Sequence, residues 1–234
     1  MSCYLRLMRK EDVKLVTEID REAFPTNWPA PDYQRELKNR LAHHTVACYG
    51  EEPSEQPGDT FSPEKSRTGL TSMLKRLFVV DHTSGNGQSS STGDYVTGFV
   101  GLWVLADEAH ITSIAVRESH RRRGIGELLL IGVIDQAAEL HANIVTLEVR
   151  VSNTGAQNLY TKYAFANMGV RKGYYTDNRE DAFIMSTESI TSEAFQAQFQ
   201  QLKQAHAEKL GISLPEIGGQ PMHPASRLSQ PDRR

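Results

Sequence analysis

Hydrophobic and polar positions follow two kinds of period along this chain, and together they predict one mixed α/β domain. Strict alternation is typical of a strand, and recurrence every three to four residues is typical of a helix. Because the polar turn around Asp107 is short, the strands on either side of it are expected to form an antiparallel hairpin. Strands are predicted at 4–8, 45–49, 95–105, 110–116, 144–149, 165–172 and 182–186. Helices are predicted at 13–23, 32–41, 124–140 and 154–163.

Residues 51–92 interrupt this pattern. They are rich in Ser, Gly, Pro and acidic residues, so we expect a largely disordered insertion. Five apolar residues inside it are spaced as on an amphipathic turn or two, and this patch could serve either as satellite packing or as a partner site. They are Leu70, Met73, Leu74, Leu77 and Phe78.

The pattern changes again after residue 190. Apolar residues from Phe195 to Leu210 form one helical stripe between a candidate N-cap, Thr191 or Ser192, and a candidate C-cap, Gly211. The predicted organisation is therefore a domain over 1–190, an amphipathic helix over 191–211 and a loose tail over 212–234.

Composition excludes several classes of protein. The net charge of −3 provides no global basic field for nucleic acid. Two cysteines, Cys3 and Cys48, lack the spacing of a disulfide scaffold or a zinc site, so no metal is expected. No apolar run approaches 18 residues and no signal-peptide core is visible, so we expect a cytoplasmic protein that does not enter a membrane.

The most informative stretch joins the predicted strand ending at Val116 to the predicted helix beginning at Gly124. Three arginines, 121–123, precede Gly124 and Gly126. The N-terminus of a helix carries unpaired N–H groups and a partial positive charge, and glycine lets a phosphate approach the backbone closely. The turn therefore suits a diphosphate, although a solvated arginine-rich loop has the same composition. Neither a Walker A loop nor a complete dinucleotide fingerprint is present.

One run of letters points elsewhere. Asp107-Glu108-Ala109-His110 has the form of a helicase ATPase motif. That chemistry needs a Walker A partner to hold the phosphates, and the chain has none. We therefore interpret these residues as a polar hairpin turn.

Residues Arg121 to Gly126 match R/Q-x-x-G-x-G/A, the coenzyme A signature of the GNAT superfamily of N-acetyltransferases. Further segments, in the same order, resemble its RimI-type group of ribosomal-protein acetyltransferases. These segments are 23–29, 147–153, 159–160, 173–175 and 179–182. The resemblance covers about 3–50 and 94–188. It implies the acyl-CoA N-acyltransferase fold, a mostly antiparallel sheet flanked by helices, with acetyl-CoA as co-substrate.

The resemblance also implies roles for individual residues. Glu148 corresponds to the general base and Tyr160 to the general acid. Asn153 would contact the cofactor arm, whereas the backbone of Ile114, Ala115 and Val116 would hold pantetheine and the acetyl carbonyl. Main-chain N–H groups that would bind the diphosphate belong to Arg122, Arg123, Gly124, Ile125, Gly126 and Glu127. Aromatic side chains that would grip the acceptor are Phe24, Trp28, Tyr33, Tyr174 and Tyr175.

The residues alone leave alternatives open. Glu148 could simply pair with Arg150 or Arg171, Tyr160 could be a core tyrosine, and Tyr174 with Tyr175 could be ordinary strand residues. One position departs from the family, which usually has glycine where this chain has Ala164. If that residue needs a positive φ, alanine costs about 1 kcal/mol.

The expected acceptor is a protein N-terminus. At pH 7 roughly 14% of an α-amine is neutral, against about 0.04% of a lysine amine. Within the RimI-type group the resemblance implies a ribosomal protein that begins with alanine or another small residue. A lysine or small-amine acetyltransferase and a non-catalytic acetyl-CoA-binding module are the alternatives. The sequence does not indicate the oligomeric state.

Overall fold

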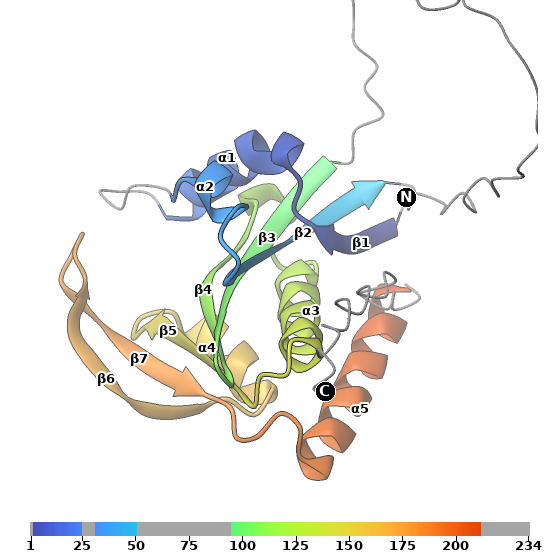
Figure 1. Ribbon diagram of the computed structural model, residues 1–234, viewed down its shortest axis with the longest axis vertical. Coiled ribbons are helices and arrows are strands. Elements are labelled where there is room, and N and C mark those ends of the chain that lie inside the picture. The colour runs from blue at the N-terminus through green and yellow to red at the C-terminus, as the bar shows by residue number, and fades with distance from the viewer. Residues whose placement is uncertain (1, 25–30, 51–94, 212–234) are drawn as a thin grey trace, which may run out of the picture. The chain divides into compact units, whose positions relative to one another are not determined.

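The computed structural model describes residues 2–24, 31–50 and 95–211, which form a mixed sheet with helices on both faces (Figure 1). The strand order is β1-β2-β3-β4-β5-β7-β6, and every neighbouring pair is antiparallel except β4 with β5. The fold class expected from the sequence is confirmed. The strands are β1 (Ser2–Leu7), β2 (Ala42–Gly50), β3 (Tyr95–Leu105), β4 (Glu108–Val116), β5 (Ile144–Arg150), β6 (Ala166–Tyr175) and β7 (Glu180–Ser186).

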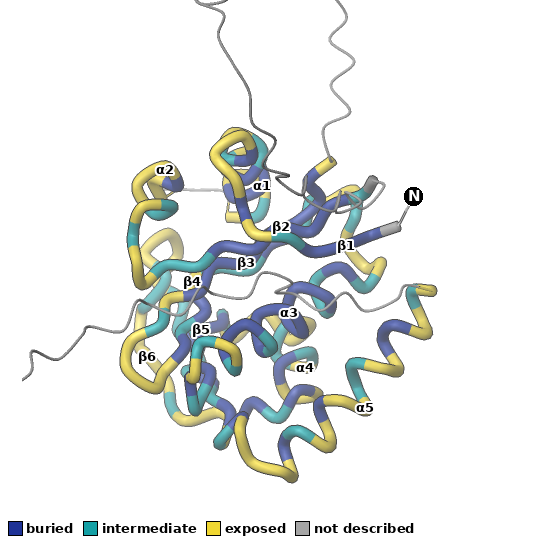
Figure 2. The backbone as a smooth tube through the Cα atoms, turned by 45° about the vertical axis from the view of Figure 1, so that its right-hand side comes forward, coloured by how far each residue is buried: buried dark blue, intermediate teal, exposed yellow. Residues whose placement is uncertain are grey.

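Two hydrophobic cores lie on opposite faces of the sheet. One contains α3, α4 and α5, and the other contains α1 and α2. Every residue of α3 from 128 to 134 is buried (Figure 2), as expected of a helix that is apolar all round. The helices are α1 (Val13–Ala23), α2 (Tyr33–Glu36), α3 (Ile125–Glu139), α4 (Thr154–Lys162) and α5 (Glu193–Leu210), with short 3-10 turns at Lys10–Asp12 and Glu118–His120.

Strands β4 and β5 diverge in the middle of the sheet. They pair only over Glu108–Ile111 and Ile144–Leu147. A shift in the β3–β4 register follows, because Gly101 faces Ser113 whereas Leu102 faces Ile111, which makes Thr112 the extra residue of a bulge. Beyond it β4 stays with β3 and β5 stays with β7. Over 112–116 the edge of β4 nearest β5 therefore pairs with no strand of the described chain.

Most predicted elements are confirmed to within a few residues, but the helix predicted at 32–41 is wrong in length. It ends at Glu36, because Asn39 turns the chain by accepting a hydrogen bond from the Leu41 N–H, and β2 begins at Ala42. The helicase-like run is a tight hairpin in which Ala106, with φ 55°, and Asp107 join β3 to β4.

The C-terminal helix was predicted correctly. The Ser192 side chain accepts from the Phe195 N–H at 3.3 Å, and Gly211 ends α5 with φ 62°. It belongs to the same packed unit as the sheet. The predicted insertion at 51–92, its apolar patch and the tail at 212–234 lie outside the described residues.

Ala164 adopts a φ of 62°, the left-handed conformation that favours glycine. We therefore predict that Ala164→Gly raises the free energy of unfolding by about 0.5–1 kcal/mol, measured by chemical denaturation. Ala205→Gly, at an exposed position inside α5, is the matched control and should lower it by about 1 kcal/mol. A destabilised Ala164→Gly protein would contradict this account of the turn.

Candidate active site

The turn before α3 presents free backbone donors. Gly124 is the N-cap, with φ 86°, and no side chain caps the helix. The first intrahelical bond of α3 runs from the Leu128 N–H to the Gly124 carbonyl at 2.9 Å, so the N–H groups of residues 125–127 have no partner inside the helix. We call residues 122–127 the glycine turn.

Arginine side chains around this turn have different surroundings. Arg121 donates from Nε to the Val116 carbonyl at 3.2 Å and so fixes the loop to β4. Arg122 and Arg123 are exposed, and nothing in the described ranges forms an ion pair with either. Free N–H donors, a glycine N-cap and two unpaired guanidinium groups suit a diphosphate.

The glycine turn lies next to the β4–β5 divergence. The side chains of Ile114 and Val116 pack toward α3, whereas that of Ala115 joins the core on the α1 face. Because these side chains point to the two faces of the sheet, the backbone of residues 114–116 lies along the side of β4 that pairs with no described strand. Asn153 is the N-cap of α4, and its Oδ1 accepts from the Ala156 N–H at 3.2 Å, so its side-chain amide N–H groups remain available to a ligand.

Glu148 is the candidate base on β5, on the face opposite α3, because its neighbours Leu147 and Val149 point into the α3 core. Its side chain is only 7% exposed, with Oε2 lying 3.3 Å from His110 Nε2 and Oε1 lying 3.2 Å from Arg171. The hydrogen bond from His110 is the main cause that lowers the pKa of Glu148, burial opposes it, and the positive charge of Arg171 makes a smaller contribution in the lowering direction. Of the two ion pairs left open by the sequence, that with Arg171 forms.

His110 was not predicted as a site residue. Its Nδ1 lies 2.9 Å from the Thr146 hydroxyl, and that hydroxyl donates to Glu108 at 2.6 Å. Because the Thr146 hydrogen is directed to Glu108, Thr146 accepts from His110. The other ring nitrogen faces the Glu148 carboxylate, which also only accepts. Each ring nitrogen of His110 therefore faces an oxygen that accepts. The pairing of His110 with Thr146 between β4 and β5 brings these side chains together. The pattern of hydrophobic and polar residues within one strand does not show which residues of two strands are paired.

Tyr160 lies on α4 and is only 5% exposed, with its ring 5.7 Å from that of Phe165. Its hydroxyl hydrogen-bonds to no group in the described part of the chain. Burial, and then the nearby Tyr175, raise the pKa of Tyr160, so the phenol stays protonated at neutral pH. A neutral phenol without a partner can donate a proton to a ligand.

Two tyrosines at the end of β6 lie near the same carboxylate. Their rings are perpendicular at 5.2 Å, and the Arg171 guanidinium lies 5.5 Å from the Tyr174 ring. Burial is the main cause that raises the pKa of Tyr175 to about 12, and Glu148 contributes. Arg150 stacks on Tyr175 at 3.9 Å and pairs with Asp177 and Glu180, so it is not the partner of Glu148.

The aromatic residues near α1 and α2 that were expected to grip the acceptor have different surroundings. Phe24 is 40% exposed at the end of α1 and remains a candidate. Tyr33 is 1% exposed and donates from its hydroxyl to Asp20 at 2.8 Å, so its expected role in gripping a substrate is corrected to packing of the α1 core. Trp28 lies outside the described residues.

Comparison with known proteins agrees with this geometry. The profile of the acetyltransferase (GNAT) family matches residues 59–165. The chain is 32% identical over 182 residues to a putative ribosomal protein bS18-alanine N-acetyltransferase of Bacillus subtilis, covering 77% of this chain and 92% of the relative. It is also 32% identical over 183 residues to an N-alpha-acetyltransferase of Sulfurisphaera tokodaii, covering 78% and 90%.

Solved structures share the fold. The ribosomal-protein-S18-alanine N-acetyltransferase from Escherichia coli aligns with a TM-score of 0.56 at 22% identity, over 82% of this chain and 97% of that one. A GNAT family acetyltransferase from Elizabethkingia anophelis, solved with acetyl-CoA bound, aligns with a TM-score of 0.53 at 18% identity, over 80% and 98%. The fold and the relatives thus define an acyltransferase. The chain belongs to the GNAT family of acetyltransferases.

None of the helices in the described segments is both long and apolar enough to cross a lipid bilayer.

Gly126 offers a clean test of the glycine turn. A Cβ at this position would meet only Val116 Cγ2, at 3.8 Å, so a side chain fits the fold. We predict that Gly126→Asp folds normally but lowers coenzyme A affinity at least tenfold by calorimetry, because it adds an anion where the diphosphate would lie. Gly126→Ala is the uncharged control.

Gly124 is less suitable for this test, because a Cβ there would lie 2.9 Å from His206 Cε1 and because Gly124 itself has a positive φ. Unchanged coenzyme A binding by Gly126→Asp would show that the diphosphate lies elsewhere.

Proposed function

We propose that this protein is an acetyl-CoA-dependent N-alpha-acetyltransferase that modifies the N-terminal amine of a protein. We further propose that its substrate is a ribosomal protein with a small first residue, as the names of its Bacillus subtilis and Escherichia coli relatives suggest. The observation that carries the proposal is the buried Glu148 carboxylate beside the β4–β5 divergence, held between His110 and Arg171.

The cofactor supplies an activated thioester, and the residues described above fit it. N–H groups of Ile125, Gly126 and Glu127, with the side chains of Arg122 and Arg123, would bind the diphosphate. The unpaired backbone edge over 114–116 would hold the pantetheine arm. A backbone N–H at this edge would also polarise the thioester carbonyl.

The acceptor amine must be neutral to attack. The positive charge of Arg171, beside Glu148, disfavours a neighbouring ammonium and so favours the neutral amine, whose proton Glu148 would take through a water molecule. An α-amine, with a pKa near 7.8, needs far less help than a lysine.

The departing thiolate needs a proton. Tyr160 is neutral, its hydroxyl is unengaged by the described residues, and Tyr175 lies close to it on the side of Glu148. These properties suit the general acid. Tyr174 and Tyr175 would then flank the acceptor backbone next to Glu148.

A comparison of acceptors tests the proposal. We predict acetyl-CoA turnover with a peptide that begins with alanine, at least tenfold faster than with the same peptide blocked at its N-terminus and containing an internal lysine, or with spermidine. Glu148→Gln should retain coenzyme A binding and lose at least tenfold in kcat. Faster acetylation of the lysine or of spermidine would assign a different acceptor. Binding of coenzyme A without turnover on any amine would indicate a non-catalytic module.

Replacing Tyr160 by Phe removes one hydroxyl from the proposed acid. We predict that kcat falls by about tenfold to a hundredfold, whereas coenzyme A affinity changes less than threefold, measured by steady-state kinetics and calorimetry. Thermal unfolding controls for the fold. An unchanged kcat would remove Tyr160 from the mechanism.

A further inference from the structure

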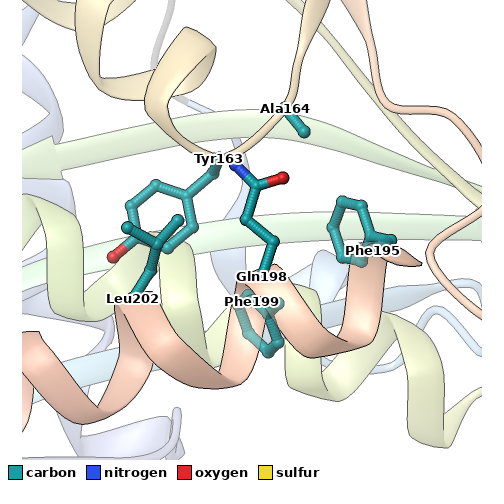
Figure 3. Close-up of a pocket in the computed structure, with 6 residues that line it drawn as sticks. All are labelled: Tyr163, Ala164, Phe195, Gln198, Phe199 and Leu202. Carbon is teal, nitrogen blue, oxygen red and sulfur yellow. The ribbon is translucent and has the colours of Figure 1, made fainter. Parts of the chain in front are cut away.

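Helix α5 docks against the side of the molecule that carries the glycine turn. Phe195 and Phe199 stack at 5.9 Å, and the Tyr163 ring meets Phe199 edge-on at 6.3 Å. Figure 3 shows Tyr163, at the end of α4, over Leu202 of α5, with Gln198 next to it and Phe199 and Phe195 farther along the helix. The family profile ends at residue 165, so α5 lies beyond the matched segment.

His206 extends this contact to the turn itself. The residue is 2% exposed, and its Nε2 lies 3.1 Å from the Gly124 carbonyl. A carbonyl only accepts, so Nε2 carries the hydrogen and donates. Residue 124 also has no room for a side chain, since a Cβ would meet His206 Cε1 at 2.9 Å and Leu210 Cδ2 at 3.1 Å. The imidazole thus fills the space beside the N-cap of α3.

The other ring nitrogen lies beside Glu127. His206 Nδ1 is 3.3 Å from Glu127 Oε2 but forms no hydrogen bond with the described residues, whereas the carboxylate accepts from Lys162 at 2.5 Å and from the Tyr163 hydroxyl at 2.8 Å. Burial opposes ionisation of Glu127, but these hydrogen bonds outweigh it and lower its pKa. Side chains of α5 therefore meet two residues of the glycine turn, Gly124 and Glu127, and Glu127 is also held by Lys162 and Tyr163 at the end of α4.

We propose that His206 is a positioning residue for acetyl-CoA binding, which holds the Gly124 carbonyl so that the N–H groups of residues 125–127 are aligned before the cofactor arrives. The inference rests on the proposed function, because the turn must be the diphosphate site. Gly124 has no side chain to restrict its backbone, so a turn released by α5 would sample other conformations. Ordering it on binding would then weaken affinity without changing the chemical step.

Three substitutions at one position test this. His206→Ala removes the donor, His206→Asn places its amide near Nδ1 and cannot reach the carbonyl, and His206→Gln places its amide near Nε2 and can. We predict that Ala and Asn raise the Kd for coenzyme A by about three- to tenfold, that Gln stays within twofold, and that kcat and the acceptor KM are unchanged in all three.

A second readout needs no cofactor. The Leu128 N–H bonds to the Gly124 carbonyl, so its hydrogen exchange in the ligand-free protein reports opening of the turn. Exchange should accelerate in the Ala and Asn variants and remain near the wild-type rate in Gln.

Lys203→Met is the matched control. Lys203 lies one turn earlier on α5 and pairs with Asp135 of α3 at 2.6 Å, away from the glycine turn. The Lys203→Met substitution should lower the melting temperature and leave the Kd for coenzyme A unchanged. An unchanged Kd in His206→Ala, or an increase in Lys203→Met equal to that in His206→Ala, would overturn the inference. Failure of the wild-type protein to bind coenzyme A would instead overturn the proposed function.

Discussion

The parting of β4 from β5 after Ile111 is the constraint on which the site depends. The bulge at Thr112 changes the course of β4, and the parallel pairing of β4 with β5 ends at the pair Ile111–Leu147. Backbone N–H and C=O groups in the middle of a sheet normally find partners in the neighbouring strand. Here one side of β4 faces no paired strand over residues 112–116, although β4 lies in the interior of the sheet. An elongated polar ligand can therefore form hydrogen bonds to the backbone of this stretch.

The same divergence separates two electrostatic environments. On the α3 side the glycine turn and two exposed arginines provide a positive end for a phosphate. On the other face the buried Glu148 carboxylate lies between the more exposed His110 and Arg171, so its charge is compensated locally. A thioester reaching through the parted strands would connect the two. This geometry explains how a diphosphate site on one face of the sheet can serve a carboxylate on the other.

Much of this could be predicted from the sequence, and the failures have physical reasons. The glycine turn follows from a local pattern, the start of one helix, whereas Glu148 was expected from the resemblance of residues 147–153 to the RimI-type group. His110 could not be found in this way, because its role depends on the register of β4 against β5. The expectation for Tyr33 was wrong because an aromatic residue that follows a Pro-rich segment can lie either on a surface loop or in a core, and the sequence does not distinguish the two. His206 lies more than 80 positions from Gly124 along the chain, and only the docking of α5 brings the two together.

The C-terminal helix has further consequences for the architecture. The positive φ of Gly124 and the packing of His206 against it are two parts of one arrangement, because any side chain at 124 would displace the imidazole. Glu127 then joins α3 and α5 to α4, on which Tyr160 lies three residues before Tyr163. A shift of α5 would therefore act on the glycine turn directly and on the candidate acid through a short, buried path. In this chain the helix beyond the family's matched segment packs on the domain through its apolar stripe and also contacts the glycine turn through His206.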